Sequence, residues 1–64
     1  MFQINDVLFD NKLNEKVRLT GIEFDPSTEK MIYVVESKVH DRIERSIYDL
    51  SDIRYNQKGR GKIG

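Results

Sequence analysis

The residues of this 64-residue chain that could do chemistry are few and scattered. His40 is the only histidine, and only Asp41 stands beside it to share a metal ion or to orient it as a general base. We therefore expect His40 to lie exposed in a loop. The chain has no cysteine, which excludes a disulfide, a thiolate metal site and a cysteine nucleophile. No serine stands in the G-x-S-x-G context of a nucleophile elbow.

Two weaker patterns could still indicate an enzyme. Asp49 and Asp52 stand three residues apart and would share one side of a 3₁₀ turn, but so small a domain offers no cleft for a substrate. The segment Gly59-Arg60-Gly61-Lys62 has the residue types of a phosphate-binding loop, without the strand and helix that should flank it. We predict that the protein is not an enzyme, with no catalytic residues, no metal ligands and no cofactor.

The composition limits the architecture and the compartment. Eleven Lys and Arg balance eleven Asp and Glu, and 38% of the residues are apolar. Since 64 residues are near the lower limit for one hydrophobic core, we expect one domain. The longest apolar run, residues 31–35, is far short of the roughly 20 residues that cross a bilayer. We also expect no signal peptide, and we predict a cytoplasmic protein with no membrane partner.

The only shift in composition is at the C-terminal end. From residue 54 onward the chain has four basic residues, three glycines and no acid. Such a segment gains little burial to offset the entropy of ordering it. We predict a single small domain over residues 1–55 and a flexible, basic, Gly-rich tail over residues 56–64.

Three segments have the apolar pattern of strands, residues 7–9, 16–24 and 31–36. The third is apolar on both faces, which is typical of a central strand. Residues 25–30 contain Pro26 and several turn formers, so we predict a hairpin between the second and third strands. We assign all three phenylalanines, Phe2, Phe9 and Phe24, to the core.

The second strand changes phase in its middle. Val17 and Leu19 alternate in one phase, whereas Ile22 and Phe24 alternate in the other. Glycine inside a strand often marks a bulge or bend, so we place one at Thr20-Gly21. We expect the strand to swap its buried face there and to serve two sheets, as strands of small closed barrels do.

Residues 37–53 can be read in two ways. With a helical period, Val39, Ile43, Ile47 and Leu50 form an amphipathic stripe, with Ser37 as the N-cap. With a period of two, the row of Ile43 and Ile47 would also contain an arginine. Periodicity alone therefore favours a helix, and the alternative architecture is a three-stranded sheet plus one C-terminal helix.

Taken together, the segments resemble a bacterial SH3-like small β-barrel of the KOW and Tudor-like group. The resemblance rests on an entry segment at residues 2–9, on a long bent strand, hairpin and central strand at 17–36, and on residues 45–53. It implies that residues 42–48 form a strand, followed by a 3₁₀ turn near Asp49–Asp52 and a short closing strand. We side with the resemblance and predict an all-β, five-stranded SH3-like barrel over residues 1–55.

The candidate binding residues are surface aromatic and basic side chains, because in small barrels such residues stack bases or peptide groups. For Tyr33 we favour the alternative in which the ring fills the edge of the core, and for the other two tyrosines both positions stay open. The full set is Tyr33, Arg42, Arg45, Tyr48, Arg54, Tyr55, Lys58, Arg60 and Lys62.

Two non-enzymatic functions fit these observations. The first is an interaction module that binds a protein partner through a barrel face or a strand edge, acting as a monomer or weak homodimer. Small cysteine-free chains of this kind are, by association, often accessory proteins of phages or mobile elements. The second is an RNA- or DNA-binding barrel that uses the basic tail and the surface Tyr and Arg residues. The zero net charge ranks the protein partner first, because dedicated nucleic-acid domains are usually basic.

Overall fold

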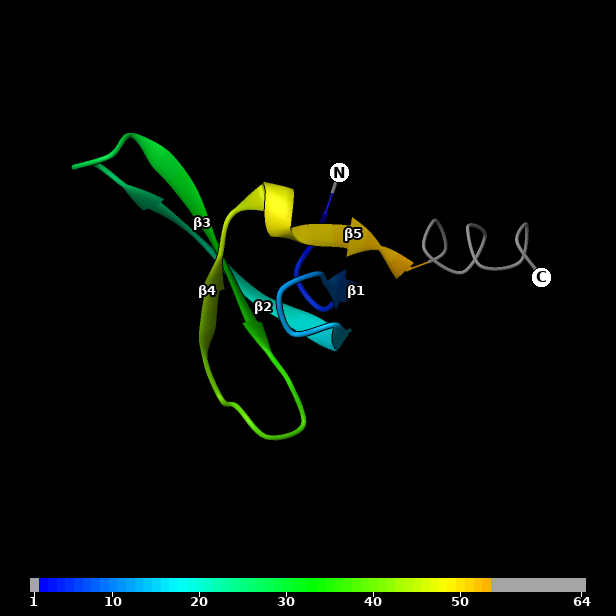
Figure 1. Ribbon diagram of the computed structural model, residues 1–64. Coiled ribbons are helices and arrows are strands. Elements are labelled where there is room, and N and C mark those ends of the chain that lie inside the picture. The colour runs from blue at the N-terminus through cyan, green and yellow to red at the C-terminus, as the bar shows by residue number, and fades with distance from the viewer. Residues whose placement is uncertain (1, 54–64) are drawn as a thin grey trace.

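The computed structural model describes residues 2–53, which form five antiparallel strands and one 3₁₀ turn (Figure 1). The all-β prediction is therefore confirmed, and the predicted tail at 56–64 lies outside the described residues. In chain order the elements are β1 (Val7–Asp10), β2 (Glu15–Asp25), β3 (Lys30–Glu36), β4 (Ile43–Arg45), η1 (Ile47–Asp49) and β5 (Leu50–Asp52).

The five strands form one sheet in the order β4-β3-β2-β1-β5. Strands β1 to β4 form an antiparallel meander. The chain then passes through η1 to β5, which pairs with β1 at the other edge of the sheet. Within residues 2–53 no ladder joins β4 to β5, so these two short strands are the edges of the sheet. The sheet therefore bends strongly but is not hydrogen-bonded into a closed ring over the described residues.

The alternative C-terminal helix is wrong, because residues 43–45 pair with β3. That pairing places Ile43 opposite Val35, where it packs against the core. A helix would have buried Val39 on the same stripe, but this side chain is 76% exposed in the loop before β4. Ser37, the predicted helix N-cap, instead accepts hydrogen bonds from the backbone N–H groups of Val39 and His40 in a tight turn. The 3₁₀ turn is confirmed, two residues earlier than expected.

A bulge interrupts the pairing of β2 with β3 at the predicted place, but its effect is the opposite of the predicted one. Leu19 lies opposite Val35 and Gly21 lies opposite Val34, so Thr20 is the extra residue. The extra residue cancels the phase change in the sequence, because residues directly opposite each other share a face. Ile22 therefore stays on the same face as Leu19, and the strand does not swap its buried face.

The core cluster lies on this face of the bent sheet, whereas Val34, which is also buried, lies on the other face opposite Gly21. Its buried members come from all of β1, β2, β3 and β5, and they are Leu8, Val17, Leu19, Tyr33, Val35 and Leu50. Phe2, Leu13 and Ile43 pack against them from the edge. Phe2 meets Tyr33 edge to face, with the ring centroids 6.2 Å apart.

The assignment of all three phenylalanines to the core is only partly correct. Phe2 does pack against the core cluster. Phe9 is half-buried on the opposite face, where its neighbours in register are Lys16 and Ser51. Phe24 lies on the core face but is 58% exposed, because no element covers the outer end of β2.

A buried ion pair ties β1 to β4, two strands that are not neighbours in the sheet. The side chain of Asp10 is fully buried, and its Oδ2 lies 2.9 Å from Nε of Arg45, whose side chain is 16% exposed. The other carboxylate oxygen, Oδ1, accepts hydrogen bonds from the backbone N–H groups of Lys12 and Leu13. Asp10 thus holds the loop between β1 and β2 in shape while it anchors the edge strand β4.

We predict that Arg45→Met lowers the free energy of unfolding by about 3 kcal/mol, because it leaves the Asp10 carboxylate buried without its cation. Urea denaturation followed by circular dichroism measures the loss. Arg42→Met is the matched control, since Arg42 is half-exposed and pairs with surface carboxylates, and we expect it to lower the free energy of unfolding much less than Arg45→Met does. Equal losses in the two variants would contradict a structural role for the buried pair.

We also predict that Gly21→Ala raises the free energy of unfolding by about 0.4–1 kcal/mol. Gly21 does not have a positive φ, and an added Cβ would meet the nearest atom, Cβ of Val34, at an ordinary contact distance of 3.6 Å. The substitution would therefore restrict the unfolded chain without straining the folded one. The midpoint of urea denaturation checks this, and a lower midpoint would mean that the bulge depends on glycine itself.

Candidate binding surface

Five of the eight large apolar side chains that are exposed within residues 2–53 gather around the outer end of the β2–β3 hairpin. Phe24 and Met31 are opposite each other in register and are 58% and 45% exposed. Ile22 follows on the same face, opposite Tyr33. The 3₁₀ turn η1 adds Ile47 and a 90% exposed Tyr48. We call these five residues, Ile22, Phe24, Met31, Ile47 and Tyr48, the hairpin surface.

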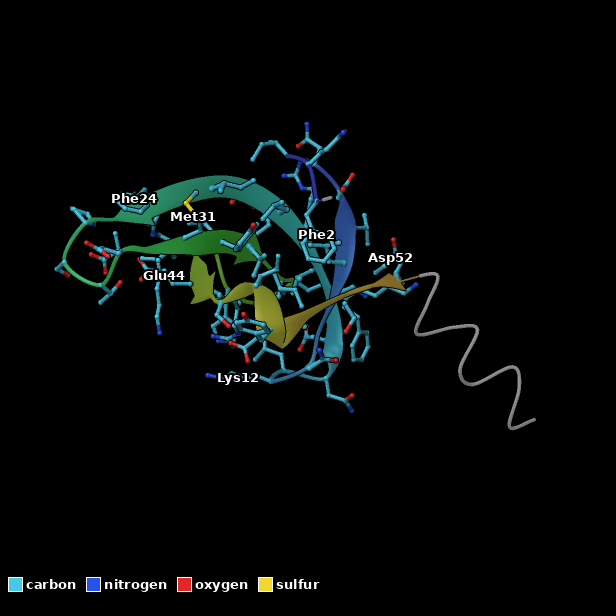
Figure 2. All side chains as sticks on the ribbon, turned by 90° about the horizontal axis from the view of Figure 1, so that it is seen from above. Phe2, Lys12, Phe24, Met31, Glu44 and Asp52 are labelled. Atoms are coloured by element: carbon cyan, nitrogen blue, oxygen red, sulfur yellow. The ribbon has the colours of Figure 1, made fainter. Side chains whose placement is uncertain are left out.

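The hairpin surface is exposed because its two strands are longer than their neighbours. β1 pairs with β2 only over residues 15–18, and β4 pairs with β3 only over residues 33–35. Beyond the ends of both neighbours, residues 23–25 and 30–32 form a two-stranded ribbon whose core face continues outward without cover. Figure 1 shows this ribbon reaching away from β1 and β5, and Figure 2 shows Phe24 and Met31 together on it, apart from Phe2.

A groove of about 450 Å³ runs along the hairpin surface between β3 and η1. Its apolar lining comes from Met31, Tyr33, Ile47 and Tyr48, and its polar lining from Lys30 and Ser46. The buried Tyr33 is part of the lining, although only 9% of the residue is exposed. The groove therefore offers a mostly apolar wall with one cation at its end.

Local hydrogen bonds hold η1 in place beside the groove. The hydroxyl of Ser46 accepts from the backbone N–H of Tyr48, and the carboxylate of Asp49 accepts from the backbone N–H of Ser46. This reciprocal pair is a capping box. The Asp49 backbone carbonyl also accepts from the N–H of Asn11, which ties η1 to the β1–β2 loop. The exposure of Tyr48 is thus set by a turn that is anchored at both ends.

The tip of the hairpin is also fixed by its own hydrogen bonds. Oδ1 of Asp25 accepts from both the backbone N–H and the hydroxyl of Ser27, at 3.0 and 2.7 Å. The hydrogen bond from the Ser27 hydroxyl is the main cause that lowers the pKa of Asp25 below its ordinary value. Glu29 closes the turn with a φ of 58°, a left-handed conformation that is costly for a residue other than Gly, Asn or Asp.

The arginines of residues 2–53 are engaged with carboxylates. Arg18 pairs with Glu36, and Arg45 is held by Asp10. The Nη2 atom of Arg42 lies 3.0 Å from Glu23 and 3.2 Å from Glu44. The pKa of Arg42 is raised mainly by its hydrogen bond to Glu23 and next by its hydrogen bond to Glu44.

The residues that we predicted as a binding site do not lie together in the structure. Tyr48 is 90% exposed and lies in the wall of the groove. Tyr33 occupies the core position that we favoured. Arg45 is held in the buried pair with Asp10, and Arg42 pairs with Glu23 and Glu44, which lie on the face of the sheet away from the groove. Arg54, Tyr55, Lys58, Arg60 and Lys62 lie outside the described residues.

Four members of the hairpin surface were missed by the sequence analysis. Ile22, Phe24 and Met31 alternate as core residues do, and Ile47 falls on the apolar stripe of the discarded helix. The signal that could have found them is length, since a predicted second strand of residues 16–24 cannot be covered along its whole length by a first strand of residues 7–9.

The remaining candidates for chemistry are dispersed. His40 is exposed as expected, with Nδ1 3.3 Å from the hydroxyl of Ser37. Within residues 2–53 no three His, Asp or Glu side chains gather where they could hold a metal ion. Over the same residues no helix has the length and apolar character to span a bilayer.

Comparisons of the chain with protein-family models, with characterised proteins and with solved structures found no match.

We predict that Ser27→Ala raises the pKa of Asp25 toward its ordinary value, because the hydroxyl donor is lost while the backbone N–H remains. When a carboxyl group has a lower pKa in the folded state than in the unfolded chain, it stabilises the folded state at pH values above the unfolded pKa. This stabilisation disappears as the pH falls through the folded pKa. The variant therefore loses stability near neutral pH and converges with the natural chain in acid.

An NMR titration of the side-chain carboxyl carbons measures this pKa directly. Ser51→Ala is the control, since the Ser51 hydroxyl bonds with Asn11 and not with Asp25. An unchanged Asp25 titration in Ser27→Ala would contradict the hydrogen-bonded tip.

Proposed function

We propose that this chain is a non-enzymatic interaction module with an SH3-like barrel fold, and that it binds a protein partner through the hairpin surface. The order of a long bent strand, its hairpin, a central strand, a short strand, a 3₁₀ turn and a short last strand supports the fold. The proposal on function rests on one observation, the exposed apolar face of the ribbon formed by residues 23–25 and 30–32.

An exposed apolar face of this kind is unusual for a surface that meets only water. Scattered apolar side chains are normal on proteins, but contiguous patches mark interaction sites. Here Phe24, Met31 and Tyr48 supply aromatic and thioether groups, which are the types enriched at the centres of protein interfaces. The groove beside them is mostly apolar with few polar groups, as binding grooves are.

The nucleic-acid function is the weaker candidate over the described residues. A strand of RNA or DNA needs cations for its phosphates as well as rings for its bases. Tyr48 offers a ring and Lys30 a cation in the same groove, but Arg18, Arg42 and Arg45 are already bound to carboxylates. Freeing an arginine from its carboxylate would oppose phosphate binding, and the eleven acids of the chain add repulsion.

We predict that a displayed library of random 16-residue peptides yields sequences that bind the full chain. Their binding should fall at least about tenfold in the double variant Phe24→Ser/Met31→Ser, which removes two anchors from the centre of the surface. Val39→Ser is the matched control, because Val39 is exposed and apolar but lies in the β3–β4 loop. Fluorescence anisotropy measures the affinities, and circular dichroism confirms that the variants fold.

Peptides that bind the double variant as well as the natural chain would overturn the proposal, and so would a library that yields no binder. A parallel titration with labelled single-stranded RNA and duplex DNA at about 50 and 200 mM salt tests the other candidate. Binding that falls about a hundredfold between these concentrations would indicate roughly four phosphate contacts and assign the chain to nucleic acid.

A further inference from the structure

We infer that the partner is an extended peptide segment in which an apolar residue stands directly next to an Asp or Glu, and that the acid pairs with Lys30. The inference rests on the proposed function and names the chemistry of its partner. Three features of the ribbon carry it, namely the free edge of β3, the apolar groove beside that edge, and the position of Lys30.

The free edge of β3 can pair with an extended segment of a partner. β4 pairs with β3 as far as Tyr33 and Arg45, and at Ser46 the chain turns away into η1. Over residues 30–32, no strand of the described chain pairs with β3 on the side that β4 occupies further along. Peptides add to such exposed edges by main-chain hydrogen bonds, and pockets for alternate side chains give the specificity.

The groove lies where the first of those side chains would fall. A residue opposite Met31 would share the face of Met31, which is the face of the core and of the groove. The lining there is Met31, Tyr33, Ile47 and Tyr48, so an apolar side chain fits this position. Neighbouring positions of the same segment would point to the other face, because side chains alternate along a strand.

Lys30 is the cation at the end of the same edge. It lines both the groove and a second depression along the edge of β3, which Thr28, Ile32 and Glu44 also border. Among residues 2–53 Lys30 takes part in no ion pair. Asp25 is opposite it in register, but the Oδ1 atom of Asp25 is occupied by Ser27.

Charge complementarity therefore favours an acid in the partner. An acid opposite Lys30 would lie on the face away from the groove, beside the second depression, where the carboxylate of Glu44 is already bound to Arg42. It would meet Lys30 as a cation that has no carboxylate partner among residues 2–53. A residue opposite Lys30 is directly adjacent in sequence to the residue opposite Met31. The register of the sheet thus predicts an acid immediately beside the apolar anchor, and not two residues away.

The experiment selects peptides from the same displayed library against four full-length proteins. These are the natural chain, Lys30→Glu, Lys30→Gln and the control Lys38→Glu, which changes an exposed lysine of the β3–β4 loop that does not line the groove. We expect Asp or Glu next to an apolar residue in the peptides selected by the natural chain and by Lys38→Glu. We expect Lys30→Glu to select Lys or Arg at that position, and Lys30→Gln to select neither charge.

The affinities provide a second measurement. The best acidic peptide should bind Lys30→Glu about five- to tenfold more weakly than the natural chain, as expected for reversal of an exposed pair, and its Glu→Lys version should recover on Lys30→Glu. Peptides that need Phe24 and Met31 but show no acidic preference, or no switch with Lys30→Glu, would overturn this inference and leave the proposed function standing. Peptides that do not need Phe24 and Met31 would overturn both.

Discussion

The carboxylate of Asp10 is the point on which the rest of this small sheet depends. It is fully buried, and its two oxygens satisfy the Arg45 guanidinium and two backbone N–H groups of the β1–β2 loop. Because Arg45 lies on β4 and Asp10 on β1, the pair forces strands that are not neighbours to approach each other, which bends the sheet around its core. A buried charge is tolerated only when it is paired in this way, so the bend and the pair require each other.

The Asp10–Arg45 pair also explains why no other element covers the hairpin surface. Arg45 is the last residue of β4, and the chain must turn at Ser46 to bring Leu50 back beside Asp10 in β5. β4 therefore stops halfway along β3, and the outer ribbon continues alone (Figure 1). The geometry that closes one end of the molecule thus leaves the other end open, with an apolar face and a free strand edge.

The sequence predicts well where the strands lie, but it predicts poorly which parts of their apolar face are covered by other elements. The segments 16–24 and 31–36 and the bulge at Thr20 all follow from local alternation, which is a property of each strand by itself. Phe24 was assigned to the core because alternation shows which face a residue shares, and it says nothing about whether another element covers that face. The Asp10–Arg45 pair spans 35 positions in the sequence and has no local pattern, so nothing in the apolar periodicity could reveal it.

The free end of the hairpin also has a consequence for motion. A two-stranded ribbon without a third strand or a covering layer is marginally stable in water, and regions with few buried apolar contacts open at low free-energy cost. The amide hydrogens of residues 23–25 and 30–32 should therefore exchange with solvent by local opening, whereas those of residues 15–19 and 33–35 should exchange only through global unfolding. One strand, β2, would then carry both the most protected and the least protected part of the sheet, so that the ribbon can adjust its shape without disturbing the core.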